Sequence, residues 1–312
     1  MILDGDKMEI RIFGDNDLER VAALLDNNFE YDSMSTSLLQ EKIYDDPEYD
    51  PATILVAVEN KTIIGFMQGV MRQIRGEIIG YIKLMAVDAR RRREGIARAM
   101  YRRLEAHFRE KDADKVRFYD VPFNYFMPGI DPRYTAALCF AMRMGFERFA
   151  DTSNLLVELQ TQDWSTRNEE EGLKIKDKRI EIKRAGENDK QILLDFIDTE
   201  FPLWRAEVTA SFRSEPVAVH IALHDGKVKA FSGHNGNNIG TGWFGPMGTH
   251  PDLRGKGIGG ILLKRCLADM KNWGLEYGII PWVGPIDFYA HYANAYVDRV
   301  FWRYEKRLKM KE

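Results

Sequence analysis

The sequence has few cysteines and few histidines. Its 312 residues include two cysteines, Cys139 and Cys266, and six histidines. Two cysteines so far apart do not make a zinc quartet, and a disulfide framework is not expected in a chain of this size. Three histidines, His220, His224 and His234, follow one predicted hairpin at an irregular spacing that does not suit a metal site. We therefore expect reduced thiols and no bound metal.

Long apolar runs and a charge excess are also lacking. No hydrophobic stretch is long enough to cross a membrane, and the segment MILDGDKMEI at the start carries acids where a signal peptide needs cations. The sequence thus predicts no membrane partner and a cytoplasmic location. A net charge of −3 excludes a wholly electropositive surface for nucleic acid, and we interpret the run Arg90–Arg93 mainly as solvated charge. With 45% hydrophobic and 30% charged residues, the composition is that of a globular protein with a sizeable core.

What the sequence does contain is an internal repeat. The segment LMAVDARRRREGIA, residues 84–97, aligns without a gap to PMGTHPDLRGKGIG, residues 246–259, so that Arg92 matches Arg254. A repeat at the spacing of about one small domain indicates a duplicated domain. We predict an N-terminal domain over residues 1–160, a polar linker over 161–178 and a C-terminal domain over 179–312.

The segments that flank the two copies also match. Each copy follows a hairpin with alternating apolar residues and precedes an amphipathic helix and a short strand. A further helix and strand are expected to close each half. The predicted elements around the copies are strands over 78–87 and 242–249, helices over 96–111 and 258–272, and strands over 115–121 and 277–282.

The glycine-rich loop RGKGIG, residues Arg254–Gly259, is the strongest chemical signal. Glycines let a ligand approach the backbone, and unpaired N–H groups at the start of a helix attract an anion. Arg254 and Lys256 would add charge-assisted hydrogen bonds. The loop is therefore a candidate phosphate or pyrophosphate site. It lacks the Lys-Ser/Thr pair of a P-loop, and it follows a hairpin rather than the first strand of a dinucleotide-binding unit.

The pattern Arg-x-x-Gly-x-Gly/Ala, after a fourth strand and before a long helix, resembles the acyl-coenzyme A loop of the GNAT N-acetyltransferases. Arg254–Gly259 matches it fully, and Arg92–Ala97 matches the form with alanine. The resemblance covers both halves. It implies an α/β fold of two tandem domains, each a mixed, mostly antiparallel twisted sheet flanked by helices. It also implies acetyl-CoA as the co-substrate and no metal.

The same resemblance implies which residues hold acetyl-CoA. Main-chain groups near the end of the predicted strand would pair with the pantetheine arm, and one amide there would polarise the thioester carbonyl. The loop would hold the pyrophosphate. The implied residues are Met247, Gly248, Thr249, Arg254, Gly255, Lys256, Gly257, Ile258 and Gly259, and the strand counterparts in the first half are Met85, Ala86 and Val87.

Acetyl transfer to an amine needs a base for the amine and a proton for the departing thiolate. The segment PWVGPIDFYAHY supplies Asp287, which is a candidate base and equally a candidate helix cap. Tyr289 fits the tyrosine of the family's F-Y-x-x-x-G helix, which protonates the coenzyme sulfur. The usual glycine of that motif is missing, so Tyr292 and Tyr296 stay open as alternatives.

The first half lacks this tyrosine. Counting back from Gly145 puts the corresponding position at Ala141, which has no phenol. We expect this half to be a non-catalytic scaffold that is still able to hold coenzyme A. An unusual loop nearby leaves a different arrangement open, with Asp120, Tyr125, Asp131 and Tyr134.

Aromatic residues in the second half mark the expected acceptor side. Trp204, Trp243 and Trp282 lie where an acceptor would enter, and aromatic faces beside carboxylates suit sugars, although such rings also fill cores. The two-domain layout and the closing segment look most like the bacterial glucosamine/glucosaminide N-acetyltransferases. We therefore expect a small-molecule amine as partner, with an amino sugar as the best candidate. The alternatives are another small amine, a protein amine, or an acetyl-CoA sensor without turnover. The oligomeric state stays open.

Overall fold

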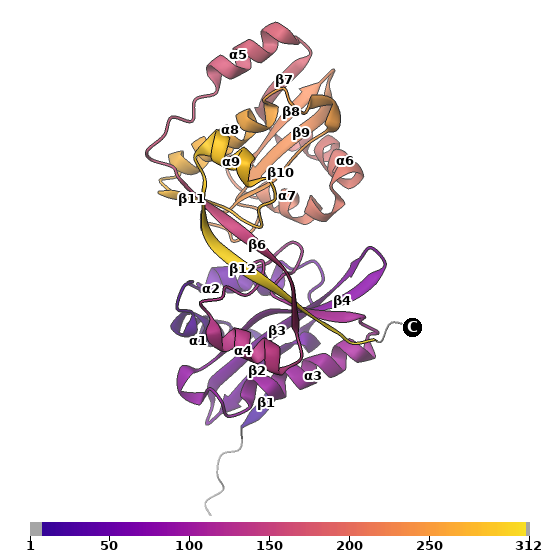
Figure 1. Ribbon diagram of the computed structural model, residues 1–312, viewed down its shortest axis with the longest axis vertical. Helices are drawn as coiled ribbons and strands as arrows, with labels where there is room; N and C mark the ends of the chain where they lie inside the picture. Colours follow the sequence, from indigo (N-terminus) through magenta and orange to yellow (C-terminus); the bar gives the residue numbers. More distant parts are fainter. Residues whose placement is uncertain (1–7, 310–312) are drawn as a thin grey trace, which may run out of the picture. The chain divides into compact units, whose positions relative to one another are not determined.

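The computed structural model describes residues 8–309 and divides them into two compact units (Figure 1). Unit 1 comprises residues 8–121, 125–151 and 301–309, and unit 2 comprises residues 122–124 and 152–300. Two strands, β6 (Glu147–Glu158) and β12 (Tyr296–Arg307), have residues in both units.

Unit 1 is built on a mixed sheet. Its first four strands pair antiparallel in chain order. The fifth strand pairs parallel to the fourth over four residues, 79–82 with 115–118, and the two described strands are not paired beyond that stretch. The β-branched and aromatic residues of the long central strands are buried, as expected of a sheet covered on both faces. The strands are β1 (Glu9–Ile12), β2 (Ile54–Glu59), β3 (Thr62–Ile74), β4 (Glu77–Val87) and β5 (Lys115–Phe118).

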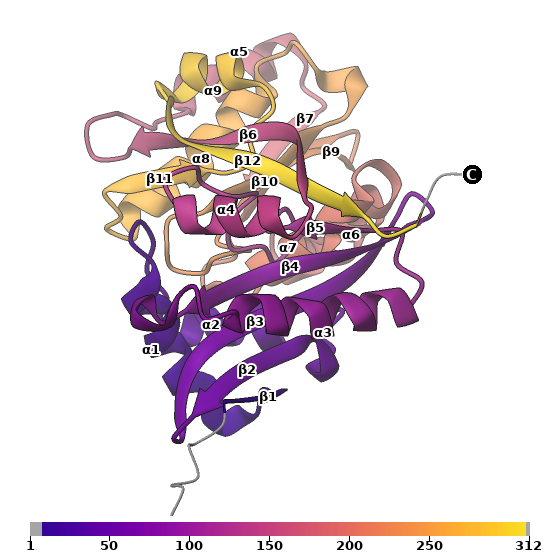
Figure 2. The same ribbon diagram turned by 60° about the horizontal axis from the view of Figure 1, so that its bottom comes forward.

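Helices cover both faces of the unit 1 sheet (Figure 2). α3 (Ile96–Glu110) lies close against one face, because Gly69 and Gly80 have no side chain there: an added Cβ would lie 2.5 Å from Leu104 or Phe108. The opposite face is covered by α1 (Leu18–Asn28) and α2 (Thr36–Tyr44), and α4 (Thr135–Arg143) precedes β6.

Unit 2 repeats this plan with an antiparallel sheet in the order β10-β9-β8-β7. Successive residues of a strand point to opposite faces. On β9, Ser232 accordingly contacts Cys266 of α8, while Phe231 contacts Phe196 of α6. The elements are β7 (Ile180–Arg184), α6 (Lys190–Glu200), α7 (Arg205–Ser211), β8 (Val219–His224), β9 (Lys227–His234), β10 (Phe244–Thr249), α8 (Ile258–Asn272), β11 (Tyr277–Ile280) and α9 (Ile286–Ala293).

Each unit is closed by a strand from the other half of the sequence. In unit 1, the end of β12 pairs antiparallel with β5, and Tyr304 faces Phe118. In unit 2, the end of β6 pairs antiparallel with β11, and Leu155 faces Ile280. We expected each half to close with its own strand. The compact units therefore differ from the segments 1–160 and 179–312 in their last strands.

The segment predicted as a linker contains a helix, α5 (Arg167–Lys176), that belongs to unit 2. Trp164, which precedes α5, is buried, and its indole N–H donates to the Leu159 carbonyl at 2.9 Å. Arg265 of α8 pairs with Glu170 at 2.7 Å.

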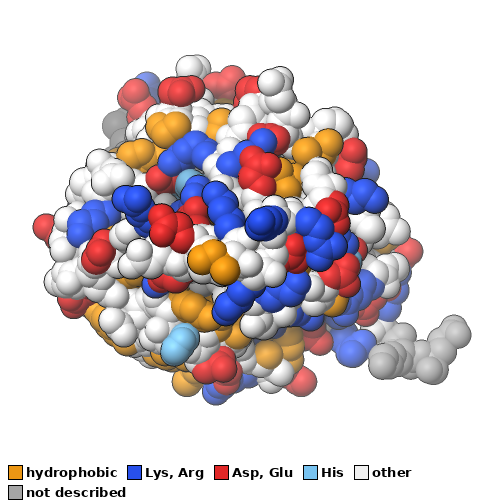
Figure 3. Space-filling model, turned by 90° about the horizontal axis from the view of Figure 1, so that it is seen from above, with side chains coloured by type: hydrophobic (Ala, Val, Ile, Leu, Met, Phe, Trp, Pro, Cys, Tyr) orange, Lys and Arg blue, Asp and Glu red, His pale blue; other side chains and the backbone are white. Residues whose placement is uncertain are grey.

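Seen from the α5 end, Lys and Arg side chains alternate with Asp and Glu (Figure 3). Within residues 8–309, no helix combines the length and the apolar character needed to cross a membrane.

Candidate functional site

The strand that leads into the glycine loop of unit 2 carries a bulge. Phe244 of β10 faces His234 of β9, and Met247 faces Ser232, so two residues of β10 oppose one residue of β9 in between. β10 continues past the bulge to Thr249, whereas the described pairing with β11 is a single bridge between Ile279 and Trp243, the residue before β10. The predicted pantetheine segment Met247–Thr249 thus lies where the two strands diverge, and its outer edge has no strand partner among the described residues.

The loop turns at two glycines. Gly255 has a φ of 75° and Gly257 a φ of 80°, which is the left-handed region that favours glycine. An added Cβ at either position would meet nothing within 4 Å. No side chain of the described residues caps α8, so the amides of Ile258 and Gly259 lack both a cap and an intrahelical partner. Open space, unpaired N–H groups and a helix N-terminus fit the pyrophosphate of acetyl-CoA.

The two cations of the loop have different surroundings. The Arg254 side chain folds back, and its Nε donates to the Thr249 carbonyl at 3.0 Å, which holds the loop against the end of β10. The Lys256 side chain is 41% exposed, with its Nζ 4.0 Å from Asp177. Arg254 therefore holds the loop in place, whereas the Lys256 ammonium stays accessible to solvent.

A cavity of about 660 Å³ lies over the loop. It is lined by Gly255, Lys256 and Gly257, by α5, and by Tyr292 of α9. Tyr292 packs directly on α8, because an added Cβ at Gly260 would lie 2.3 Å from its ring. Tyr292 thus lies at the glycine loop.

The helix α9 also brings Phe288 and Tyr289 to this place. An added Cβ at Gly259 would lie 3.3 Å from Phe288 and 3.6 Å from Met247, so loop, strand and helix meet at one point. Tyr289 is 8% exposed and packs edge-on against Phe244 at 6.1 Å. Burial raises the pKa of Tyr289 to about 12, so the phenol keeps its proton at neutral pH.

The turn after α9 shows which residue of the first half corresponds to Tyr289. The Tyr289 carbonyl accepts the amide of Ala295 at 3.3 Å, just as the Ala141 carbonyl accepts the amide of Phe146 at 3.0 Å. Asn294 and Gly145, the residues before these amides, both have a left-handed φ. Tyr289 thus occupies the position of Ala141, with one extra residue in the turn that follows.

The other two predicted catalytic residues are more exposed than Tyr289. Asp287 is exposed in the first turn of α9, and Pro285, not Asp287, is the N-cap. Tyr296 is the first residue of β12 and is 46% exposed. Desolvation and then the charge of Glu158 raise the pKa of Tyr296, which places it near the end of β6. The structure places Tyr292 at the loop and Tyr289 in the core beside Phe288, and it leaves Tyr296 near the end of β6.

The three predicted acceptor tryptophans have different surroundings. Trp204 is half-buried and stacks on Phe201 at 4.9 Å. Phe201 lies directly under β10, since an added Cβ at Gly248 would be 2.7 Å from its ring. Trp282 is half-buried, and its amide donates to Asn154 at 3.0 Å. Trp243 is only 7% exposed and is part of the core.

Unit 1 has a larger cavity, of about 860 Å³, at its own glycine loop. The Arg92 Nε contacts the Val87 carbonyl at 3.4 Å, as Arg254 contacts Thr249 in unit 2. Two phenols, Tyr119 and Tyr134, line this cavity. Sequence reasoning singled out Tyr134 but missed Tyr119, because nothing local marks a single tyrosine after a strand as a cavity residue.

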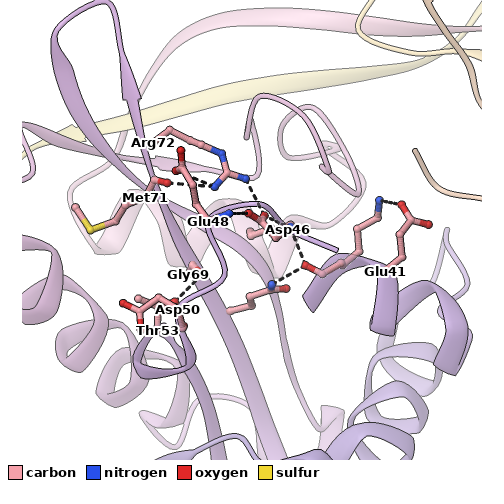
Figure 4. Close-up of polar contacts among 11 residues, drawn as sticks. Glu41, Asp46, Glu48, Asp50, Thr53, Gly69, Met71 and Arg72 are labelled. Carbon is pink, nitrogen blue, oxygen red and sulfur yellow. Dashed lines mark hydrogen bonds and ion pairs between the residues drawn. The ribbon is translucent and has the colours of Figure 1, made fainter. Parts of the chain in front are cut away.

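The sequence also offered no indication of two buried clusters of charged side chains, one in each unit. In unit 1, Asp46 accepts from Arg72 at 2.7 Å (Figure 4). It also accepts from Lys83 at 2.5 Å. Burial alone would raise the pKa of Asp46, but the positive charges of Lys83 and Arg72 outweigh it and hold the pKa below its usual value. Lys83 is the bulge residue of β4. Among residues 8–309, no three His, Cys, Asp or Glu side chains are grouped to hold a metal.

The second cluster lies in unit 2 around Asp269 of α8. Its carboxylate accepts from Arg184 at 2.6 and 2.7 Å and lies 2.8 Å from His220 Nε2 and 3.3 Å from His234 Nε2. Burial alone would raise the pKa of Asp269, but these hydrogen bonds hold it far below its usual value. Burial lowers the pKa of His220. The cluster joins α8 to β7, β8 and β9.

Comparisons with known proteins agree with this geometry. The model of the acetyltransferase (GNAT) family matches the chain twice, over residues 18–124 and 187–291. The chain is similar to the GCN5-related glucosamine N-acetyltransferase region of a fungal multi-domain GH3 β-N-acetylglucosaminidase, with 19% identity and a TM-score of 0.79. That match covers 97% of this chain and 38% of the fungal chain.

Two further solved structures match over nearly their whole length. One is a GCN5-related N-acetyltransferase from Sphaerobacter thermophilus, with 15% identity, a TM-score of 0.68, and 97% of this chain and 96% of that chain covered. The other is a tandem GNAT protein of the clavulanic acid biosynthesis pathway, with 12% identity, a TM-score of 0.67, and 98% and 100% covered. No curated protein matches the chain. The fold class predicted from the sequence is confirmed.

Proposed function

Because the chain belongs to the acetyltransferase (GNAT) family and is therefore an acetyl-CoA-dependent N-acetyltransferase, we propose that unit 2 acetylates the amine of an amino sugar. The observation that carries this proposal is the meeting of Met247, Gly259 and Phe288 at one point, with the buried phenol of Tyr289 next to it. An anion loop, a diverging strand edge and a protonated phenol are the parts that thioester aminolysis requires.

The loop and strand residues bind the coenzyme in this proposal. The open amides at the start of α8 and the Lys256 ammonium bind the pyrophosphate. Arg254 keeps the loop folded through its bond to Thr249. Main-chain groups of Met247–Thr249 hold the pantetheine arm, and one of these amides stabilises the charge that develops on the thioester oxygen.

Tyr289 and Asp287 handle the protons. The acceptor nitrogen forms a bond to the acetyl carbon while the carbon–sulfur bond breaks. Asp287, exposed at the start of α9, takes the proton that the amine loses. Tyr289 gives its proton to the departing thiolate, a role that suits a phenol whose pKa is raised to about 12. Tyr292 is the alternative donor, because it also lies at the loop.

An amino sugar fits the groups on the acceptor side. Trp204, stacked on Phe201 beneath β10, and Trp282 offer half-buried aromatic faces, which suit the apolar face of a sugar ring. The amine of a hexosamine is less basic than that of lysine because of its hydroxyl neighbours, so one exposed carboxylate suffices as the base. The similarity to a glucosamine N-acetyltransferase region supports the same acceptor class.

Thiol release from acetyl-CoA, followed with glucosamine, a polyamine and a lysine peptide, tests the proposal. We expect turnover with glucosamine, loss of turnover in Asp287→Asn, and an unchanged acetyl-CoA affinity in that variant. Turnover with the peptide alone would assign a protein amine instead. Binding of acetyl-CoA without turnover on any amine would identify a sensor and refute the proposal.

A further inference from the structure

The cavity of unit 1 extends well beyond its anion loop. It begins at the glycine loop around Gly95, passes the strand segment Met85–Val87, and reaches Phe29 and Glu30 after α1. Ala141, the residue at the position of Tyr289, is fully buried and has no hydroxyl group. A proton donor in unit 1 must therefore come from another element.

Tyr134, just before α4, is held firmly at one end of this cavity. Its hydroxyl donates to Asp32 Oδ2 at 2.7 Å and accepts the Tyr31 amide at 3.0 Å. Its ring packs edge-on against Phe29 at 6.2 Å and against Tyr31 at 5.2 Å. Because the Tyr134 hydroxyl already donates to the Asp32 carboxylate, its proton can move to Asp32 when the phenol oxygen receives another proton.

Tyr119, just after β5, lies at the strand edge of the same cavity. Its hydroxyl is 3.5 Å from the Met85 carbonyl, and the residue is 5% exposed. Burial raises the pKa of Tyr119, and the charges of Tyr134 and Asp32 raise it further. Both phenols line the same cavity. Tyr119 makes no bond to a carboxylate among the described residues and keeps its proton.

We propose that unit 1 is a second acetyl-transfer centre, in which the Tyr134–Asp32 pair accepts the proton of the acceptor amine and Tyr119 protonates the departing thiolate. This proposal does not depend on the assignment of amino-sugar acetylation to unit 2. The glycine loop fits the coenzyme as its copy does: Gly95 has a φ of 87°, and within residues 8–309 no atom lies within 4 Å of an added Cβ and no side chain caps α3.

The reaction balances with these groups. The amine nitrogen bonds to the acetyl carbon of acetyl-CoA, and the carbon–sulfur bond breaks. The amine proton goes to the Tyr134 oxygen as the Tyr134 proton passes to Asp32. The thiolate takes the Tyr119 proton. Exchange with water then removes the proton from Asp32 and restores that of Tyr119.

The acceptor is a primary amine carried on a flat aromatic group. Phe29 lines the cavity and is backed by Phe126, whose ring stacks on it at 5.5 Å and 17°. Tyr134 adds a second aromatic face. Glu30 lines this end of the cavity and Asp32 lies behind the Tyr134 hydroxyl, so this end offers negative charge to a cationic head group. The simplest probe with these features is 2-phenylethylamine.

Binding of coenzyme A and turnover of 2-phenylethylamine in the full chain test the proposal. Gly257→Glu provides the background, because it blocks the loop of unit 2. Calorimetry should give two coenzyme A sites in the wild type, one in Gly257→Glu and none in Gly257→Glu combined with Gly95→Glu. Gly257→Glu should still acetylate 2-phenylethylamine.

Three tyrosine variants in the Gly257→Glu background test the roles. Tyr134→Phe and Tyr119→Phe should each keep the one coenzyme A site and lose roughly 10²–10⁴-fold in kcat. Tyr49→Phe, a change at a 41% exposed tyrosine of the same unit, should keep both binding and rate. One coenzyme A site without turnover in Gly257→Glu, or an unchanged kcat in Tyr134→Phe, would overturn the proposal. Neither result bears on glucosamine turnover by unit 2.

Discussion

Tyr289→Phe removes a single oxygen from the proposed site of unit 2. The ring is buried against Phe244 and Phe288, and those contacts survive in the variant. Burial alone accounts for the raised pKa of Tyr289, since no hydrogen bond to a described residue contributes. The substitution therefore breaks no native hydrogen bond, and the free energy of unfolding should change by less than about 1 kcal/mol.

The effect on turnover should be far larger. Loss of a positioned general acid costs roughly 10²–10⁴-fold in rate, which corresponds to about 2.7–5.5 kcal/mol of transition-state stabilisation. Steady-state thiol release with glucosamine gives kcat, calorimetry gives the acetyl-CoA Kd, and thermal unfolding gives stability. We expect only kcat to change.

The pH dependence sharpens this prediction. With a pKa of about 12, Tyr289 stays protonated throughout an assay between pH 6 and 10, so Tyr289→Phe should lower the whole pH profile without shifting it. Tyr296→Phe is the matched control, because Tyr296 is 46% exposed and lies away from the loop. A Tyr289→Phe enzyme at the wild-type rate, with Tyr292→Phe or Tyr296→Phe inactive, would refute the assignment.

Three predictions concern stability. Asp269→Asn should lower the free energy of unfolding by about 3–5 kcal/mol in a denaturant titration, because it leaves half-buried Arg184 without its counter-charge and buried His220 without its carboxylate partner; the exposed Asp252→Asn should change it by less than about 0.5 kcal/mol. Since burial lowers the pKa of His220 in the folded state, its contribution is present above the unfolded pKa of about 6.5 and is lost as the pH falls below it. In His220→Gln, the thermal unfolding midpoint should therefore depend less steeply on pH between about pH 6.5 and 5. A pH dependence as steep as that of the wild type would contradict this reasoning. Gly260→Val should cost about 1–3 kcal/mol by crowding Tyr292, and a variant as stable as the wild type would show that the ring moves freely.

The parts of the fold that depend on short stretches of chain could be predicted from the sequence. The helix over 258–272, the strand up to Thr249 and the loop between them follow from local hydrophobic periodicity and from glycine at left-handed positions. The same local pattern, present twice, identified the duplication. Tyr289 could be named because its helix carries a motif close to the family's.

Features set by long-range partners could not be predicted. Which strand lies beside β5 depends on pairing between residues far apart in sequence, and the apolar patterns of β6 and β12 suit either unit. Asp269 and Asp46 look like ordinary helix and loop acids until folding buries them beside cations. Tyr119 lines the unit 1 cavity and has a positive φ, and no neighbouring glycine in the sequence indicates that backbone conformation.

The most direct measurement of the central claim compares glucosamine acetylation by Gly257→Glu and by Arg92→Glu. A glutamate at position 257 places a negative charge and a strained side chain at the proposed pyrophosphate site of unit 2. Gly226→Glu is the control for strain, since Gly226 has a φ of 73° in a hairpin turn away from both loops. The account predicts background rates for Gly257→Glu and nearly wild-type rates for Arg92→Glu and Gly226→Glu. A folded Arg92→Glu protein that no longer acetylates glucosamine, beside an active Gly257→Glu protein, would move that reaction to unit 1.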